Sequence, residues 1–394
     1  MRVAIAGGGI GGLTLAGALQ AQGADVLVFE RQPEVRDTGA AISIWPNALA
    51  ALDVAGLGDV VRSLGRTLAD GGTKRLDGRV ALSFSRRSFE VALGEGLICA
   101  DRGELVRALA GRLRPGTVRT GSTVTGYDLR SSGVTVRIAD GRGLAVDALV
   151  GADGINSTIA RELNGPLRSS YSGYTAWRGI AGTSSTSWSD QIWACQAGGR
   201  EFGWMPIGDR HAYWFATSWL PQGHRFSGGD GAYLKETFGQ WPRPIPDLLA
   251  ATPPERLVRN DVVDRAMPDR WSDRAVTLVG DAAHPMRPHL GQGGCQAIED
   301  AVALACCLAK SADPATAFAD YERRRRRRAR LIIYLSRFSG FTRPPGPVTT
   351  AVDRVTSSCP RLPIGPALRA MAPIAGYRAG QRAVNGVRSG TARR

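Results

Sequence analysis

The chain opens with a short apolar run, Val3–Ala6, whose length and lack of alternation are typical of a strand buried on both faces of a parallel sheet. Glycines follow at once. After them, an alanine- and leucine-rich segment from Leu13 to about Gln22 has the pattern of a helix that ends at Gly23. A second apolar run, Asp25–Phe29, ends at Glu30. The start of the chain therefore predicts a strand, a tight turn, a helix and a second strand.

Helical and extended patterns alternate in the next part of the chain. Asp101 is the expected N-cap of a helix that runs to about Leu113. Residues 73–97 alternate between apolar and polar positions, which indicates an excursion into a second sheet. The other predicted elements are a helix around Pro46–Leu57, strands at Thr117–Asp128 and Gly133–Ala139 with a turn at Asp140-Gly141, and a buried strand at Ala148–Gly154 that ends in Asp-Gly.

Residues 170–257 differ in composition and pattern: tryptophan and tyrosine are frequent there, and alternation of apolar and polar positions replaces helical periodicity. This pattern predicts an antiparallel sheet that forms a separate domain. Residues 258–340 return to the first domain through Gly280-Asp281 and two helices. Residues 342–366 are proline-rich and indicate a linker, and the tail to Arg394 is predicted to be a short helical cap.

The glycines after the first strand carry the first chemical signal. Gly7, Gly9 and Gly12 have the Gly-x-Gly-x-x-Gly spacing, in which the first permits the turn, the second lets a pyrophosphate approach and the third lets the helix pack closely. Glu30 ends the second strand about 20 residues later, where a carboxylate accepts hydrogen bonds from ribose hydroxyls. The unit predicts a dinucleotide site, and the acid favours FAD or NAD over NADP.

Composition removes several alternatives. The 394 residues are enough for two domains, and no apolar stretch is long enough to predict a transmembrane helix. We expect the N-terminus to be a strand of the fold rather than a signal peptide, since cleavage there would destroy the glycine motif. Six scattered cysteines and four histidines show no metal-ligand spacing, so we expect no metal site and a reduced, cytoplasmic protein.

The formal net charge of +15 includes the run Arg323–Arg328. Apolar residues around it fall near one helical face, so the run is interpreted as a solvated helix face. We expect no nucleic-acid binding, because no recognised nucleic-acid motif is present. The surplus positive charge is expected to attract NAD(P)H and an anionic flavin, which affects rates rather than forming a site.

Two further motifs narrow the class of protein: Asp153-Gly154, and Gly280-Asp281 followed by a proline-rich sequel and Gly291-Gln292-Gly293-Gly294. With these two motifs and the first glycine motif, the chain resembles the single-component FAD-dependent aromatic hydroxylases of the para-hydroxybenzoate hydroxylase type. The resemblance covers roughly residues 1–340. The local sequence of segments such as Gly39–Asn47 and Gly291–Ala301 is most similar to that of the branch of urate hydroxylases and zeaxanthin-epoxidase-like enzymes.

The resemblance implies a fold and its division. It implies an α/β protein with a Rossmann-like FAD-binding domain, an antiparallel β-sheet substrate domain and a C-terminal helical segment. The predicted FAD-binding domain is discontinuous, and the proline-rich linker and helical cap follow it. The expected divisions are 1–72, 98–168 and 258–340 for the FAD-binding domain, 73–97 and 169–257 for the substrate domain, and 341–394 for the linker and cap.

The resemblance also implies which positions hold FAD. Glu30 and Arg31 would contact the adenosine part, Val124 would line the adenine pocket, and Ser43 and Arg102 would reach the flavin and its phosphates. Asp281 would bind the ribityl chain, and Gly291–Cys295 would offer backbone amides to the pyrimidine edge of the flavin. Asp153-Gly154 resembles a motif shared by FAD and NAD(P)H, with Ser157 and Arg161 on the nicotinamide path. The full predicted FAD set is Gly7, Gly9, Ile10, Gly11, Gly12, Glu30, Arg31, Ala41, Ser43, Arg102, Val124, Asp153, Asp281, Pro288, Gly291, Gly293, Gly294 and Cys295, whose own thiol is expected to be a packed side chain.

The substrate side rests on fewer signals. His289, Arg178 and Tyr213 are the candidate catalytic residues, and His289 is the candidate proton acceptor for a phenol or an N-heterocycle. His289 and the pair Arg200-Glu201 both depart from the urate branch, which argues against urate as the substrate. His284 is interpreted as a structural turn histidine. The candidate substrate-binding residues are Tyr174, Trp177, Arg200 and Met205.

The function implied is an FAD-dependent monooxygenase. NADH or NADPH would reduce FAD, O2 would form a flavin C4a-hydroperoxide, and oxygen would pass to a small planar aromatic or heterocyclic substrate by hydroxylation, with epoxidation or oxidative decarboxylation as alternatives. Two other functions stay open: a flavin dehydrogenase or reductase without productive oxygen transfer, and a non-catalytic flavin-loaded partner protein. A monomer or homodimer is expected, and a pathway of secondary metabolism is compatible with the arginine-, glycine- and alanine-rich composition.

Overall fold

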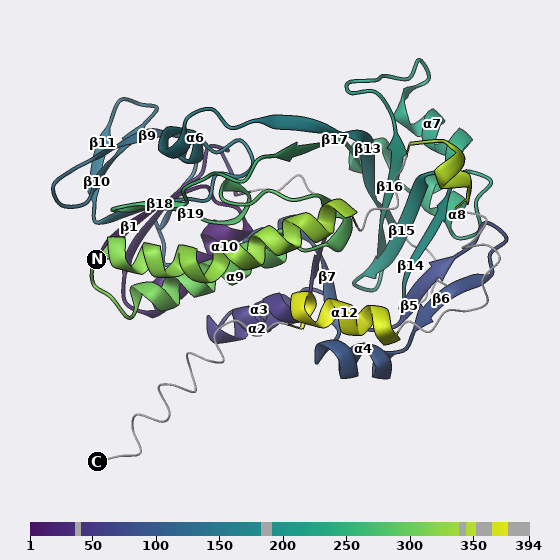
Figure 1. Cartoon of the computed structure of the whole chain (residues 1–394), viewed down its shortest axis with the longest axis horizontal. Coiled ribbons are helices and arrows are strands. Elements are labelled where there is room, and N and C mark those ends of the chain that lie inside the picture. Colours follow the sequence, from purple (N-terminus) through teal and green to yellow (C-terminus); the bar gives the residue numbers. More distant parts are fainter. Residues whose placement is uncertain (36–40, 183–190, 339–343, 352–364, 377–394) are drawn as a thin grey trace, which may run out of the picture.

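The protein is described by a computed structural model that covers residues 1–35, 41–182, 191–338, 344–351 and 365–376. Two large sheets occupy opposite ends of the long axis of the molecule (Figure 1). Strands β13 (Ser169–Gly182) and β17 (Leu257–Arg265) run from one end toward the other, so the chain crosses between the two ends along neighbouring strands.

The six-stranded sheet has the order β18-β19-β12-β1-β2-β8, and its neighbours are parallel except for β18 and β19. Its central strands are buried on both faces, which explains why they are continuous apolar runs. The strands at the start of the chain and the strand before Asp153-Gly154 are confirmed. The bounds are Arg2–Ala6 (β1), Asp25–Phe29 (β2), Val118–Arg119 (β8), Ala148–Gly151 (β12), Ser272–Asp273 (β18) and Val276–Leu278 (β19).

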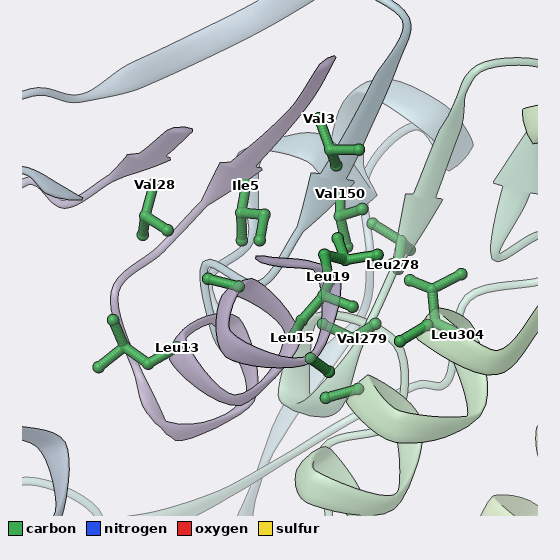
Figure 2. Close-up of a cluster of buried hydrophobic side chains, with 14 of the residues drawn as sticks. Val3, Ile5, Leu13, Leu15, Leu19, Val28, Val150, Leu278, Val279 and Leu304 are labelled. Atoms are coloured by element: carbon green, nitrogen blue, oxygen red, sulfur yellow. The ribbon is translucent and has the colours of Figure 1, made fainter. Parts of the chain in front are cut away.

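Helices α1 (Ile10–Ala21) and α9 (Gly293–Leu308) pack against each other and against this sheet. Figure 2 shows the resulting core, in which side chains of β1, β2, β12 and β19 meet those of α1 and α9. The predicted first helix is therefore confirmed, and it begins directly after the glycine turn rather than at Leu13. Because α1 and α9 come from the two ends of the chain, this core holds both glycine-rich motifs together.

Smaller elements complete this end of the molecule. Sheet β11-β10-β9 is antiparallel, and sheet β3-β7-β4 lies beside helices α3 and α5. Asp101 accepts a hydrogen bond from the Glu104 amide at 2.9 Å, which confirms it as an N-cap. The bounds are Ala41–Ile44 (β3), Arg66–Leu68 (β4), Leu97–Asp101 (β7), Val124–Leu129 (β9), Val134–Ile138 (β10), Gly143–Val146 (β11), Pro46–Val54 (α2), Gly58–Arg62 (α3), Arg102–Gly111 (α5) and Thr158–Asn164 (α6).

The seven-stranded sheet has the order β17-β13-β16-β15-β14-β5-β6 and is antiparallel except between β14 and β5. One face packs on helices α7 (Gly229–Phe238) and α8 (Ile245–Ala250), which the alternating pattern did not predict. Strand β17 is hydrogen bonded to β13 and belongs to this sheet, although the predicted boundary placed it in the other domain. The remaining bounds are Gly71–Lys74 (β5), Val80–Phe84 (β6), Ile192–Ala197 (β14), Arg200–Ile207 (β15) and His211–Trp219 (β16).

A C-terminal helix, α12 (Gly365–Ala375), packs against α4 (Arg86–Leu93) and α2, as Figure 1 shows below the two sheets. Arg328 donates to the Pro373 and Ile374 carbonyls, both at 2.6 Å, and so satisfies the end of α12. The predicted helical segment is present, while most of the proline-rich stretch and the tail beyond residue 376 lie outside the described residues.

Helix α10 (Pro314–Phe338) carries the arginine run, and the structure corrects our interpretation of it. Arg325 is only 2% exposed and Arg328 is half-buried, whereas Arg323 and Arg327 are exposed. The run is therefore not a uniform solvated face, because carboxylates on α9 draw two of its members inward. In the described part of the chain, no helix is both long and apolar enough to cross a membrane.

Candidate active site

The glycine turn between β1 and α1 leaves room for a ligand at one position and none at the other two. Gly7 has φ +112°, and a Cβ there would lie 2.3 Å from the Ala152 carbonyl oxygen. A Cβ on Gly12 would lie 2.1 Å from the Gly7 carbonyl oxygen. In contrast, a Cβ on Gly9 meets no described atom within 4 Å. The first and third glycines therefore serve the turn itself, and the second faces open space.

Glu30 closes this turn from the end of β2. Its carboxylate accepts hydrogen bonds from the Gly8 and Gln32 amides, both at 2.8 Å. The Ser122 amide donates to the Glu30 carbonyl at 2.9 Å, which brings the chain leading to Val124 beside it. The predicted adenosine contacts Glu30, Arg31 and Val124 thus lie along one edge of the sheet, and Arg31 is exposed.

Two aspartates extend the same edge. The Asp153 carboxylate accepts from the Thr158 amide at 2.7 Å, and its other oxygen is buried without a hydrogen-bond partner among the described residues. Asp281 is exposed in the turn η2 (Gly280–Ala282). The buried Arg265 donates to the Asp281 and Ala282 carbonyls at 2.8 and 2.7 Å, which fixes that turn. Both carboxylates are thus held in place while retaining capacity for a ligand.

The N-terminus of α9 lies beside Ile42 on β3 and Ile10 at the start of α1. The turn η3 (Pro288–Leu290) leads into Gly291, whose φ of +61° is in the left-handed region. The first-turn amides of α9, at Gly293, Gly294 and Cys295, have no carbonyl acceptor within their own helix. These amides, together with the helix dipole, suit a group on which negative charge collects.

Strand β3 forms the wall opposite α9. The Cys295 thiol contacts the Ser43 carbonyl at 3.5 Å and accepts from the Trp45 amide at 3.4 Å. Burial raises the pKa of this thiol to about 12, so Cys295 is a packed structural side chain, as predicted. Ala41 pairs with Asp101, the residue before Arg102, so these predicted flavin contacts lie together.

A buried polar network supports the loop from below. Asp300 accepts from the Gly280 amide at 2.9 Å and also bonds His284 and Arg325. Burial raises the pKa of Asp300, but the charges of His284 and Arg325 outweigh burial and hold that pKa at about 2. His284 is fully buried in this network, which agrees with a structural role. The network ties the Gly280-Asp281 turn to helices α9 and α10.

These features fit an extended dinucleotide such as FAD. Open space at Gly9 and a buried oxygen of Asp153 without a partner follow the neighbouring strands β1 and β12, and the unpaired amides of α9 lie close to Ile10 at the start of α1. The carboxyl ends of parallel strands form the usual ligand crevice of this architecture. No cluster of potential metal ligands occurs among the residues that the structure describes.

The inner face of the seven-stranded sheet contacts strand β3 and the loop before α9. The Ser43 hydroxyl donates to the Met205 sulfur at 3.5 Å, which joins β3 to β15. Tyr174 stacks on His289, with ring centroids 5.2 Å apart, and so joins β13 to the loop before α9. The Tyr174 hydroxyl and the His289 Nε2 are both buried, and neither has a hydrogen-bond partner among the described residues.

Arg178 and Tyr213 lie on the same face. Arg178 donates to the Asn260 side chain at 2.9 Å and pairs across the sheet with Phe215, two residues from Tyr213 on the same face. Burial raises the pKa of Tyr213. The structure therefore brings together five of the predicted substrate-side residues, which come from β13, β15, β16 and the loop before α9. These are Tyr174, Arg178, Met205, Tyr213 and His289.

Trp177 and Arg200 do not join this group, and both predictions are corrected. Side chains alternate between the faces of a strand, so Trp177 points to the opposite face, where it packs on Phe226 and Tyr233. Arg200 is exposed at the β14–β15 hairpin.

The residue missed at that hairpin is its neighbour Glu201. Phe202 and Trp204 pack on the helix-covered face, so Glu201, Gly203 and Met205 lie on the inner face. The period-2 pattern of β15 contained this signal, but the strand register was needed to tell which set faces inward.

The comparisons agree with this geometry. A family model described as an FAD binding domain matches residues 1–336. The aurachin C monooxygenase/isomerase of Stigmatella aurantiaca is 38% identical over 329 residues, which are 84% of this chain and 86% of that protein. The FAD-dependent urate hydroxylase of Klebsiella pneumoniae is 32% identical over 342 residues, covering 86% of this chain and 89% of that protein.

A solved structure resembles the whole molecule as well. Klebsiella pneumoniae HpxO complexed with FAD and uric acid has a TM-score of 0.83 to this chain at 29% sequence identity, over 98% of this chain and 95% of that chain. The predicted fold class is confirmed by this likeness. The matched regions include the glycine turn, both aspartate motifs and the seven-stranded sheet.

Proposed function

Because this chain belongs to the FAD-binding family of flavin-dependent monooxygenases, we propose that it inserts oxygen into a small planar aromatic or heterocyclic substrate held between the α9 loop and the inner face of the seven-stranded sheet. NADH or NADPH serves as the hydride donor and O2 as the oxygen source. The single observation that carries the substrate site is the stacking of Tyr174 on His289, which places two buried polar atoms without partners beside the α9 N-terminus.

The residues around the proposed site have distinct roles in charge stabilisation, exclusion of water and orientation of the substrate. Bound FAD supplies hydride acceptance and oxygen activation. The α9 amides and dipole stabilise negative charge at the adjoining part of the cofactor. Met205, Phe215 and Tyr213 form an apolar wall that limits the access of water, which favours oxygen transfer over side reactions. Arg178 and Tyr174 offer hydrogen bonds that orient a planar substrate.

We propose that His289 accepts the substrate proton. Its Nδ1 lies 3.0 Å from the Ser336 carbonyl oxygen, which can only accept, so Nδ1 carries the hydrogen. The Nε2 of a neutral His289 is then a free acceptor. Burial lowers the pKa of His289 below 6.5, and the nearby Arg287 lowers it further, so the ring is neutral at pH 7.

This assignment gives a pH-dependence to measure. We expect His289→Ala to lower kcat about 100-fold. The wild-type rate requires neutral His289, so it is full above the lowered pKa and falls as the pH drops through it, on a limb below pH 6.5. That limb should be absent from the variant. The exposed His211 on β16 provides the control, because His211→Ala should keep both the rate and the limb. An unchanged rate and pH profile in His289→Ala contradicts the assignment.

The overall function is tested with purified protein loaded with FAD. NADH and NADPH oxidation, oxygen uptake and incorporation of ¹⁸O from ¹⁸O2 are measured across a panel of phenols and N-heterocycles. Substrate-stimulated oxidation with ¹⁸O in the product is the expected result. Oxidation matched by peroxide, or dependent on a quinone acceptor, favours a dehydrogenase or reductase. Bound FAD without any stimulated oxidation across the panel favours a flavin-loaded partner protein.

The setting of the enzyme and its division into domains are also proposals. We propose a cytoplasmic monomer or homodimer, which is supported by five unpaired cysteines among the described residues and by the use of NAD(P)H. The proposed FAD-binding domain keeps the predicted ranges except that β17 is assigned to the substrate domain, as its pairing with β13 supports.

A further inference from the structure

Glu201 is the one acidic side chain on the inner face of β15, and it lies apart from the flavin end of that face. Met205 contacts Ser43, and Glu201 stands four residues earlier on the same strand, about 13 Å away at the usual rise of a strand. Its neighbours across the sheet are Gln196 on β14 and Thr217 on β16. Glu201 therefore faces the proposed substrate at a distance from the reacting atoms.

The carboxylate of Glu201 has no cationic partner. The Gln196 side-chain amide donates to this carboxylate at 3.2 Å, and Glu201 forms no ion pair among the described residues. Burial raises the pKa of Glu201 to about 7, and the Gln196 hydrogen bond only partly opposes this effect. Most carboxylates that are buried in a protein are paired with an arginine or lysine. Because Glu201 has no such partner, its carboxylate can still accept a hydrogen bond from a ligand.

A second group without a partner faces the same space. Tyr174 is 1% exposed, and its hydroxyl has no hydrogen-bond partner in the described part of the chain. Thr217 pairs with both Glu201 and Ala176, so Tyr174 lies on the same face of the sheet as Glu201, two residues along β13 from Ala176. The Glu201 carboxylate accepts from Gln196 and can still accept from an N–H or O–H donor, such as the edge of an amide, whereas the Tyr174 ring lies against His289.

We propose that Glu201 is a specificity-determining residue that selects neutral substrates with an N–H or O–H donor at the end remote from the flavin. This inference rests on the proposed function, because it assigns the substrate to the inner face of the sheet. A carboxylate at that end of a substrate would meet the unpaired Glu201 and be rejected, since like charges in a site of low polarity repel strongly. An amide at that end would donate to Glu201.

A matched pair of probes tests the proposal: 6-hydroxy-2-naphthamide and 6-hydroxy-2-naphthoate, which have the same shape and differ in charge and donor groups. Their Kd values are measured at pH 8 from the change in absorbance of FAD bound to the whole protein. We expect the wild type to bind the amide at least about 10-fold more tightly than the carboxylate. Glu201→Gln removes the charge but keeps the shape of the side chain. The ratio of the two Kd values should then fall to about 1, or the carboxylate should bind more tightly than the amide.

Controls separate specificity from folding. Glu236→Gln removes an exposed carboxylate on α7 of the same sheet domain and should keep the wild-type preference. FAD content and melting temperature are measured for each variant, and Glu201→Asp, which keeps the charge, should keep the preference for the amide. Equal binding of both probes by the wild type, no binding of the amide at about 5 mM, or an unchanged preference in Glu201→Gln overturns the proposal.

The titration uses bound FAD only as a reporter and consumes neither NAD(P)H nor O2. A protein that binds the amide selectively but incorporates no ¹⁸O contradicts the proposed function and leaves the role of Glu201 standing. A protein that incorporates ¹⁸O but shows no effect of Glu201→Gln on the preference contradicts only the inference about Glu201.

Discussion

Arg325→Met is expected to lower the free energy of unfolding by about 3–5 kcal/mol. Arg325 is 2% exposed and donates to Glu299, to Asp300 at 2.7 Å and to the Gln296 side chain at 2.7 Å. Methionine fills a similar volume but leaves two buried carboxylates without their shared cation. The loss follows from this buried charge, which Arg328 beside Glu299 compensates only in part, rather than from the removal of a favourable contact.

The same variant should lose FAD. Asp300 holds the Gly280 amide, and Glu299 accepts from Asn47 on α2 at 2.6 Å, so the network fixes two walls of the cofactor site. Urea unfolding and the fraction of FAD retained after gel filtration measure the two effects. Arg327→Met is the matched control, because Arg327 belongs to the same run on α10 and is exposed. A difference of less than about 1 kcal/mol between the two variants would contradict the role of this network.

The behaviour of the arginine run illustrates what a sequence can and cannot predict. Six consecutive arginines on a helix must cover nearly all of its faces, since successive residues are about 100° apart. Which of them is buried depends on Glu299 and Asp300, which lie on another helix. That information is tertiary, and the pattern of α10 alone does not contain it.

Local signals predicted the elements of the first β-α-β unit well. The strand, the glycine spacing, the helix and Glu30 all depend on neighbours within one β-α-β unit, and the structure places the Glu30 carboxylate on the Gly8 amide. Helices α7 and α8 were missed, because the aromatic residues around them gave an extended pattern. Strand β17 lies beyond the predicted boundary of the sheet domain, because its pairing with β13 joins residues far apart in the chain.

The substrate side shows the limit more sharply. Trp177 and Arg178 are adjacent in the sequence and face opposite sides of one strand, as do Glu201 and Phe202. A shift of register by one residue would exchange the members of each pair. Predicting pocket residues on a sheet therefore requires knowing which face is covered, and here α7 and α8 decide that.

The two glycines Gly9 and Gly12 offer the sharpest test of the cofactor site, because the structure predicts opposite effects from the same added methyl group. A Cβ on Gly12 would lie 2.1 Å from the Gly7 carbonyl oxygen, which is backbone and unable to move aside. We expect Gly12→Ala to destabilise the protein without FAD by about 3 kcal/mol. A Cβ on Gly9 meets nothing within 4 Å, and its φ of −79° suits alanine, so Gly9→Ala should stay within about 1 kcal/mol of the wild type.

The affinity for FAD should be strongly affected by Gly9→Ala, the variant that leaves the stability of the FAD-free protein nearly unchanged. The space beside Gly9 is where the pyrophosphate of the cofactor approaches the backbone, so the added methyl group of Gly9→Ala should weaken FAD about 100-fold or more while the fold persists. Urea unfolding of the FAD-free protein and fluorescence titration with FAD give the two quantities for each variant. Gly111→Ala provides the control for both, because a Cβ there also meets nothing within 4 Å and Gly111 lies at the end of α5. If Gly9→Ala keeps its affinity for FAD, the cofactor does not pass over this turn, and the assignment of the first glycine motif to the pyrophosphate is wrong.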